Sequence, residues 1–154
     1  MSHRNIDIDA LNDDRYIDEF EHLTTQTPEE VEAQVQSKAS AVRTALGRGN
    51  VEEALLIALG NPPYGQRFES AQQQNGQVVM DVLNSVKVTD IASMVSALDP
   101  DSLDVLTKYI YHGLAHPASY NCGVLLNWHE KVVENAGLGA IVRVLTDNKT
   151  IKSQ

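Results

Sequence analysis

Hydrophobic side chains recur at helical spacing along most of the chain, and glycines and prolines divide the pattern into helix-sized segments. The first segment opens at Thr27-Pro28, where Thr27 can cap a helix and Pro28 suits its first turn. Glu30 then completes a capping box with Thr27. Gly47 ends the run, because glycine is a common stop signal after a helix. The pattern therefore predicts a helix from about residue 28 to residue 46.

Six further segments follow the same pattern, and the predicted helices cover residues 50–59, 69–86, 91–98, 102–114, 119–136 and 138–145. The last segment is ambiguous, because Ala140–Leu145 is rich in β-branched residues. Its apolar residues nevertheless repeat at i, i+3, i+4 and i+7 from Leu138, and no second strand is available to pair with it. We therefore predict an all-α domain of about seven helices in a layered or short solenoid-like arrangement, an α/α superhelix.

Residues 1–26 lack this pattern, and we interpret them as an extended acidic N-terminal arm before a helical domain over 27–150 and a tail over 151–154. Tyr16, Ile17 and Phe20 lie among acidic residues in this arm, and Ile6 and Ile8 form a smaller apolar set. One interpretation is a solvated, disordered tail. The other is a binding segment that orders on a partner, because a purely solubilising tail has no use for three large apolar side chains.

The net charge of −9 is concentrated at the front of the chain. Residues 1–36 hold ten acidic and two basic side chains, whereas residues 37–154 hold eleven acidic and ten basic ones. No basic stripe is present to neutralise phosphates, so nucleic acid and anionic membranes are excluded as favoured partners. The charge distribution therefore favours proteins as the partners of this chain.

The sequence also indicates the cellular compartment of the protein. Its longest unbroken apolar run is six residues, Ala54–Leu59, far short of the roughly 18 that a membrane span needs. The acidic first ten residues do not fit a secretory signal. Cys122 is the only cysteine, which excludes an intrachain disulfide and fits a cytoplasmic protein.

A metal site is the first chemistry to consider, because His112, His116, Cys122 and His129 are residue types that bind zinc. His116 precedes a proline and is expected beyond the end of its helix, and the spacing to the other two residues matches no known zinc module. His129 also falls on an apolar stripe, where a histidine is usually part of the core. We therefore expect no metal site.

Catalytic residues and cofactor sites are not expected either. The chain has no G-x-S-x-G nucleophile motif, and Cys122 lies on a core-facing stripe where a thiol is usually inert. Asp99, Asp101 and Asp104 flank a helix start, where carboxylates cap backbone amides. The two G-x-G pairs follow helices rather than strands, so nucleotide binding is unsupported. The sequence indicates a protein that is not an enzyme.

Trp128, the only tryptophan, lies off the main apolar stripe of its predicted helix, as does Val124. The ring therefore needs a second apolar neighbour. An adjacent helix of the same chain is one alternative. A partner surface is the other, because tryptophan is enriched at binding hot spots. We include both residues as candidate partner-binding positions beside those of the arm.

Several stretches together resemble the smallest subunit, subunit 5, of the actin-related protein 2/3 complex, which nucleates branched actin filaments. They are Asn61-Pro62-Pro63, Lys108-Tyr109-Ile110-Tyr111 with Gly113, Leu125-Leu126 with Trp128-His129-Glu130-Lys131, Gly139 with Ile141–Thr146, and the acidic opening Ile6-Asp7-Ile8-Asp9 after Arg4. The likeness covers about residues 4–150, and the order and spacing of the stretches carry it.

The resemblance implies a non-catalytic, α-helical subunit of a hetero-oligomer found at actin-rich sites of the cytoskeleton. Its body is implied to pack on the β-propeller subunit of the complex, with contacts to subunit 4. Its N-terminal arm is implied to tether the second actin-related protein. The alternative function is a free-standing helical-repeat adaptor that binds short peptide segments.

Overall fold

The computed structural model describes residues 26–147 and residue 151, and this part of the chain contains seven α-helices and no strand. The helices are α2 (Pro28–Gly47), α3 (Val51–Leu59), α4 (Glu69–Ser85), α5 (Ile91–Ala97), α6 (Pro100–Ala115), α7 (Cys122–Ala136) and α8 (Leu138–Thr146). Two short 3-10 helices, η2 (Gln66–Phe68) and η3 (Val88–Asp90), precede α4 and α5. The all-α prediction is confirmed, and so is the helical assignment of residues 138–145, which α8 extends by one residue.

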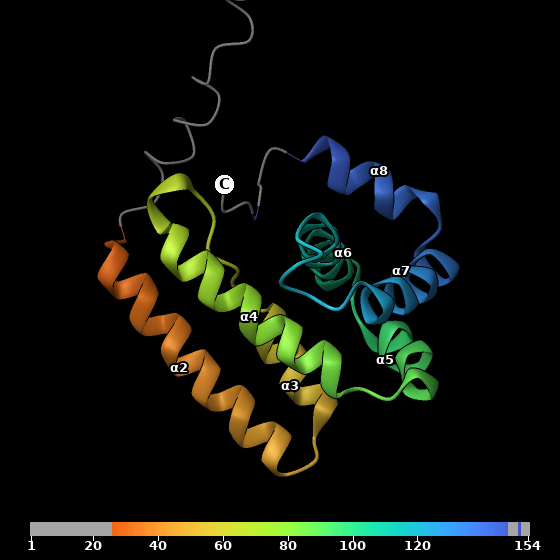
Figure 1. The fold of residues 1–154 in the computed structure, drawn as a ribbon, viewed down its shortest axis with the longest axis horizontal. Helices are drawn as coiled ribbons and strands as arrows, with labels where there is room; N and C mark the ends of the chain where they lie inside the picture. The colour runs from red at the N-terminus through yellow and green to blue at the C-terminus, as the bar shows by residue number, and fades with distance from the viewer. Residues whose placement is uncertain (1–25, 148–150, 152–154) are drawn as a thin grey trace, which may run out of the picture.

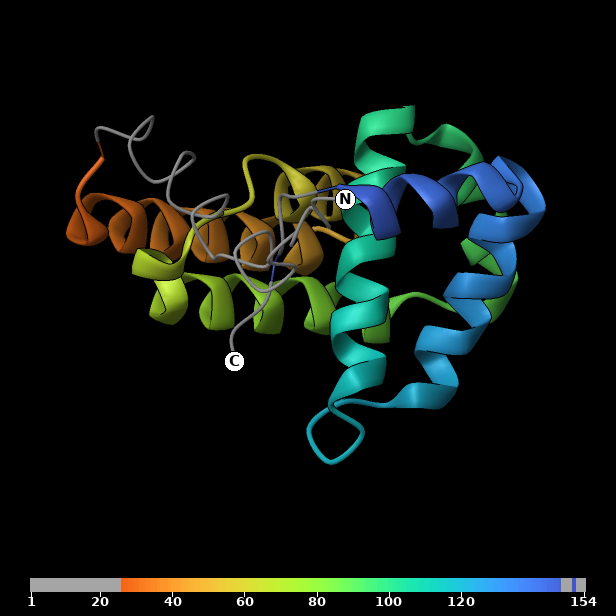
Figure 2. The same cartoon turned by 90° about the horizontal axis from the view of Figure 1, so that it is seen from above.

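The helices form two groups that meet at α6. In Figure 1, α2 and α4 run side by side with α3 behind them, and α5, α7 and α8 lie around α6. Figure 2 shows α6 standing steeply between the two groups. Helix α6 contacts α3 and α4 on one side and α7 and α8 on the other. It is therefore the element that joins the two halves of the molecule.

The helix ends follow local capping chemistry. The Thr27 hydroxyl accepts from the Glu30 amide at 3.3 Å while the Glu30 carboxylate accepts from the Thr27 amide at 2.9 Å, which is the predicted capping box. Asp99 caps α6 by accepting from the Ser102 amide at 3.2 Å. Because of this cap, α6 begins at Pro100, two residues before the predicted start. Helix α7 begins at Cys122 rather than near residue 119, because Asn121 caps it.

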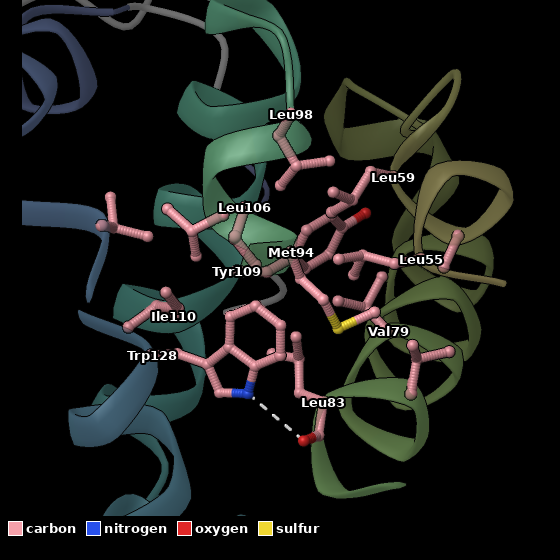
Figure 3. Close-up of a cluster of buried hydrophobic side chains, with 14 of the residues drawn as sticks. Leu55, Leu59, Val79, Leu83, Met94, Leu98, Leu106, Tyr109, Ile110 and Trp128 are labelled. Carbon is pink, nitrogen blue, oxygen red and sulfur yellow. Dashed lines mark hydrogen bonds between the residues drawn. The ribbon is translucent and has the colours of Figure 1, made fainter. Parts of the chain in front are cut away.

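A continuous hydrophobic core connects both groups of helices (Figure 3). It includes Leu55 and Leu59 from α3, Val79 and Leu83 from α4, and Ile110 from α6. Helix α6 passes its neighbours closely at Gly113. A Cβ at this position would lie 2.5 Å from Leu125 Cδ1 and 2.8 Å from Met80 Cε, so the absence of a side chain allows α4, α6 and α7 to approach one another.

The turn between α7 and α8 is a single residue, Gly137. Its backbone has φ 68° and ψ −173°, a combination that is essentially restricted to glycine. Its amide donates to Val133 O at 2.9 Å and so caps α7. The chain therefore changes direction within one residue, and α8 begins immediately.

Residue 151 also belongs to the core. The sequence places Ile151 in the C-terminal tail, yet its side chain is only 5% exposed and packs within the main hydrophobic cluster. Isolated as it is in the sequence, Ile151 shows no periodicity that predicts burial. This residue therefore contributes to the folded domain.

Candidate interaction surface

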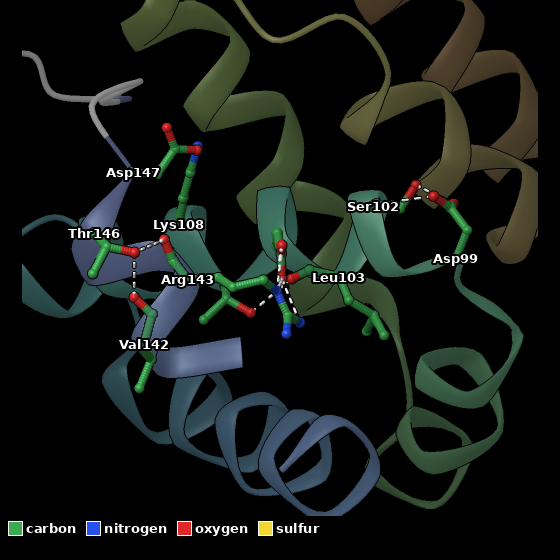
Figure 4. Close-up of polar contacts among 10 residues, drawn as sticks. Asp99, Ser102, Leu103, Lys108, Val142, Arg143, Thr146 and Asp147 are labelled. Atoms are coloured by element: carbon green, nitrogen blue, oxygen red, sulfur yellow. Dashed lines mark hydrogen bonds and ion pairs between the residues drawn. The ribbon is translucent and has the colours of Figure 1, made fainter. Parts of the chain in front are cut away.

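Helix α8 is fixed to α6 by charged side chains (Figure 4). Arg143 on α8 donates to both oxygens of the Asp104 carboxylate on α6, from Nε to Oδ2 at 2.8 Å and to Oδ1 at 3.1 Å, and from Nη2 to Oδ1 at 2.9 Å. Just beyond α8, Asp147 pairs with Lys108 of α6, with 2.5 Å between Oδ2 and Nζ. Bidentate arginine–carboxylate pairs fix geometry as well as adding energy. These pairs therefore set the orientation of α8 on the body.

The opposite side of α8 presents an apolar stripe to solvent. Leu138, Val142 and Leu145 are 73%, 57% and 74% exposed, and they recur at i, i+4 and i+7. We call these three residues the α8 stripe. Only Ala140 of this helix is buried. Helix α8 thus buries Ala140 and partly buries Ile141 and Val144, while the three residues of the stripe remain uncovered.

Such a surface is unusual for a chain that acts alone. An amphipathic helix normally buries its apolar face and exposes its polar one. Large apolar side chains gathered on an exposed face are typical of a protein–protein contact. The α8 stripe is therefore the candidate interaction surface of the body. Among the residues that the structure describes, no helix is long and apolar enough to cross a membrane.

Trp128 lies inside the chain rather than beside the α8 stripe. Its side chain is fully buried, and its indole Nε1–H donates to Leu83 O of α4 at 3.2 Å (Figure 3). The internal alternative is therefore the one that fits the structure, because the buried ring has no surface to offer a partner. Val124 is half-buried and packs against the same core. Neither residue contributes to an apolar patch on the surface.

The remaining candidate residues belong to the arm. Ile6, Ile8, Tyr16, Ile17 and Phe20 all lie outside the described residues. Their role as partner-binding positions stays a prediction from the sequence.

Among the residues first considered for a metal site, the rings of His112 and His116 are neighbours, with 4.7 Å between their centroids. His129 Nε2 lies 3.0 Å from the Tyr111 hydroxyl, whereas His116 Nδ1 lies 2.8 Å from the His112 carbonyl oxygen. Cys122 is half-buried, and its thiol points to the Tyr120 carbonyl. Over residues 26–147 and 151, no three histidine, cysteine or acidic side chains are grouped so that they could hold a metal ion.

A buried polar network in the other half of the molecule was not predicted. Lys38 Nζ of α2 donates to Gly60 O at 2.6 Å, to Asn61 O at 3.2 Å and to Asn75 Oδ1 at 2.9 Å. Asn75, fully buried on α4, in turn donates to the Tyr109 hydroxyl on α6. The network joins α2, α4 and α6, and its members are scattered in sequence, so no local motif indicates it.

Burial shifts the acid–base behaviour of this network and its surroundings. Desolvation lowers the pKa of Lys38 to about 8, and it raises the pKa of Tyr109. Burial, followed by the charge of Asp147, raises the pKa of Tyr64 to about 12. The Lys108 ammonium lies 5.2 Å from the centre of the Tyr64 ring, within the range of a cation–π contact. These shifts are explained by packing and by neighbouring charges.

Comparison with known proteins identifies relatives along almost the whole chain. The family model described as ARP2/3 complex 16 kDa subunit (p16-Arc) matches residues 2–151. Actin-related protein 2/3 complex subunit 5-C of Xenopus laevis is 40% identical over 149 residues, which cover 96% of this chain and 93% of the relative.

Relatives from two other organisms give the same result. Actin-related protein 2/3 complex subunit 5-like protein of Homo sapiens is 34% identical over 148 residues, covering 96% of this chain and 94% of the relative. Actin-related protein 2/3 complex subunit 5 of Dictyostelium discoideum is 35% identical over 122 residues, covering 79% and 87%. The aligned regions include the α8 stripe in the family match, since that match extends to residue 151.

Proposed function

This chain belongs to the family of the ARP2/3 complex 16 kDa subunit, p16-Arc, and from that premise we propose that it is a non-catalytic structural subunit supporting the nucleation of branched actin filaments. In this proposal the body docks on the complex through the α8 stripe, and the N-terminal arm tethers the second actin-related protein. Its place is the cytoplasm, at actin-rich sites. The single observation that carries the docking part is the exposure of Leu138, Val142 and Leu145 on a helix fixed by Arg143.

We assign the α8 stripe to the β-propeller subunit, with subunit 4 as the neighbouring contact. The three aliphatic side chains lie on one helix face, and covering them removes apolar surface from water, which is favourable by about 25 cal/mol per Å². The Arg143–Asp104 pair already holds the helix in place before docking. The complex therefore does not need to order α8, and less free energy is lost on binding.

The docking proposal is tested with Leu145→Asp. A carboxylate placed under a partner surface loses its hydration, so we expect the affinity for the β-propeller subunit to fall by roughly 2 kcal/mol or more, about 30-fold in Kd. The measurement is the stoichiometry of that subunit recovered with the tagged chain in a reconstituted complex. Leu56→Asp is the matched control, since Leu56 is also an exposed leucine, on α3. Equal recovery for both variants would show that the body docks through another face.

The arm is suited to a tether because of its charge and its few large apolar residues. Seven acidic and two basic residues precede Gln26, and Tyr16, Ile17 and Phe20 lie among them. Ordering each residue costs about 1–2 kcal/mol of backbone entropy, so a partner must supply compensating contacts. Because the arm is linked to a docked body, its effective concentration near that partner reaches the order of millimolar, and weak anchors are sufficient.

Deleting residues 1–22 tests the tether. We expect the helical body to remain folded and bound, because the cores of both halves lie within the described residues. The second actin-related protein should be retained less well and branch nucleation should slow. Tyr16→Ala with Phe20→Ala should reproduce part of the loss, and Ile6→Ala with Ile8→Ala a smaller part. A truncated chain that nucleates at the full-length rate would mean that the arm is only a solvated tail.

A further inference from the structure

A groove of about 800 Å³ lies between the first half of α2 and the segment that leads from α3 into α4. Its walls combine polar residues with apolar and aromatic ones, which include Val31 and Val35 on one side and Pro62, Tyr64 and Phe68 on the other. Val31, Val35 and Phe68 form a small hydrophobic cluster with Ala71, separate from the main core. The groove shares no lining residue with the α8 stripe, although its wall residue Tyr64 lies beside Lys108, which pairs with Asp147 just beyond α8.

Lys38 is the one charged side chain among the described residues that line this groove. Its ammonium donates to two backbone carbonyls and to Asn75 Oδ1, all of them neutral acceptors. No carboxylate of the described residues lies within ion-pairing distance of it. A cation in partly desolvated surroundings without a counter-ion attracts an acidic group strongly, because the local dielectric is lower than that of water. The lowered pKa of Lys38 has the same cause.

We propose that the groove binds the acidic N-terminal segment of the same chain, Asp13–Phe20, when the subunit is free. The apolar side chains of Tyr16, Ile17 and Phe20 would cover the proline and aromatic walls. A carboxylate of Asp18 or Glu19 would lie near Lys38 and be attracted by its charge, since the three N–H groups of the ammonium already donate to neutral acceptors. The charges are complementary, since residues 13–20 contain four acidic side chains and one arginine. Among the segments of this chain, it is the one that combines clustered carboxylates with two aromatic rings.

The chain is long enough to make this contact. Gln26, the first described residue, itself lines the groove. Five residues lie between Phe20 and Gln26, and the six steps from one to the other span up to about 20 Å when extended. Val31 and Lys38 lie seven residues apart on α2, or roughly 10 Å along the helix axis. Residues 21–25 can therefore return the segment along α2 with length to spare.

The contact between groove and arm does not depend on the proposed function; only its effect on assembly rests on that function. If the same aromatic residues tether the actin-related protein in the complex, the groove and that partner compete for them. The groove would then keep the anchors covered until assembly, and the tether would form by exchange. The contact itself is a property of the free chain, so it can be tested apart from the complex.

The test is paramagnetic relaxation in the full-length chain. A spin label is attached at Asn12→Cys in a Cys122→Ser background, and the amide signals of the isotope-labelled protein are compared before and after reduction of the label. We expect the signals of Val31, Val35, Tyr64 and Phe68 to lose most of their intensity, while those of α5 and α7 keep theirs. Tyr16→Ser with Phe20→Ser should restore the groove signals. Asp18→Asn with Glu19→Gln should restore them in part.

Two controls show whether the contact is specific to residues 13–20 and whether it forms within one molecule. Ile6→Ser with Ile8→Ser, a matched apolar change elsewhere in the arm, should leave the loss of signal unchanged. Mixing spin-labelled chain with unlabelled isotope-enriched chain should give no loss, because the contact is within one molecule. Loss of groove signals only in the mixed sample, or no selective loss in the full chain, overturns the inference. Either outcome leaves the tether to be judged by the deletion of residues 1–22 in the complex.

Discussion

Helices α7 and α8 are neighbours joined by one glycine, and both carry apolar residues at helical spacing. Helix α7 nevertheless buries most of its large apolar residues, with Leu126 the exposed exception, whereas α8 exposes most of its own. On α7, Leu125, Trp128 and Val132 are buried in the core, and the exposed ion pair of Lys131 with Glu134 faces solvent. On α8 the three residues of the stripe face solvent, and the charged Arg143 contacts the body.

The difference shows that spacing identifies a face but not what covers it. The period of apolar residues predicts a helix in both segments, because a helix places i, i+4 and i+7 on one side. Whether that side meets the rest of the same chain depends on the direction in which the chain leaves the preceding helix. Here the turn at Gly137 sets that direction.

Trp128→Ala should have the largest effect on the free energy of unfolding, because this residue is part of the buried face of α7. Removing a fully buried indole leaves a cavity and an unpaired Leu83 carbonyl, so we expect the free energy of unfolding to fall by about 3–5 kcal/mol. Urea denaturation followed by circular dichroism measures it. Trp128→Phe, which keeps a ring but loses the N–H donor, should cost less. Unchanged stability with a weakened affinity for a partner would instead support a partner-binding role for this residue.

Asp104→Asn should have a smaller effect, confined to α8. The change removes the carboxylate that fixes Arg143, and exposed ion pairs contribute little to global stability. We expect faster amide hydrogen exchange in residues 138–146 with little change in the unfolding midpoint, and a similar acceleration in wild type at high salt. Glu134→Gln, which breaks the exposed Lys131 pair on α7, is the control and should leave exchange in α7 unchanged. Equal protection of α8 in Asp104→Asn would show that the pair does not position it.

The smallest effect should be the pH dependence that His112, near the C-terminal end of α6, gives to the free energy of unfolding. Burial, and secondly the neighbouring His116, lowers the pKa of His112 below 6.5. Between the lowered pKa and 6.5, His112 binds more protons in the unfolded chain than in the folded one. The contribution of His112 to the free energy of unfolding is therefore complete above pH 6.5, and it is lost as the pH falls through the folded-state pKa. Chemical denaturation at pH 7.5 and 5.5 measures the difference. His112→Gln should reduce it, and an unchanged difference would assign the pH dependence to other groups.

Most of the helices could be predicted from sequence because their signals are local. Thr27 and Glu30 form the predicted capping box, and Asp99 caps α6 as expected of an acidic residue before a helix. The non-local features could not be predicted. The carbonyls that accept from Lys38 lie 22 and 23 residues away in sequence, and Trp128 meets a carbonyl 45 residues away. The exposure of the α8 stripe was equally inaccessible, because a periodic pattern is the same whether its face is inside or outside.

Gly137 has a consequence for the tolerance of this protein to mutation. The position is exposed and a Cβ there would meet nothing within 4 Å, so by the usual criteria of burial and space any residue should be accepted. Its backbone geometry excludes nearly all of them, because side chains other than hydrogen strain that conformation. Residue 137 therefore determines two properties at once, the end of α7 and the direction in which the α8 stripe faces. A substitution at residue 137 could leave a folded protein whose stripe is turned away from its partner, so a loss of assembly would arise from a residue that touches neither the core nor the interface.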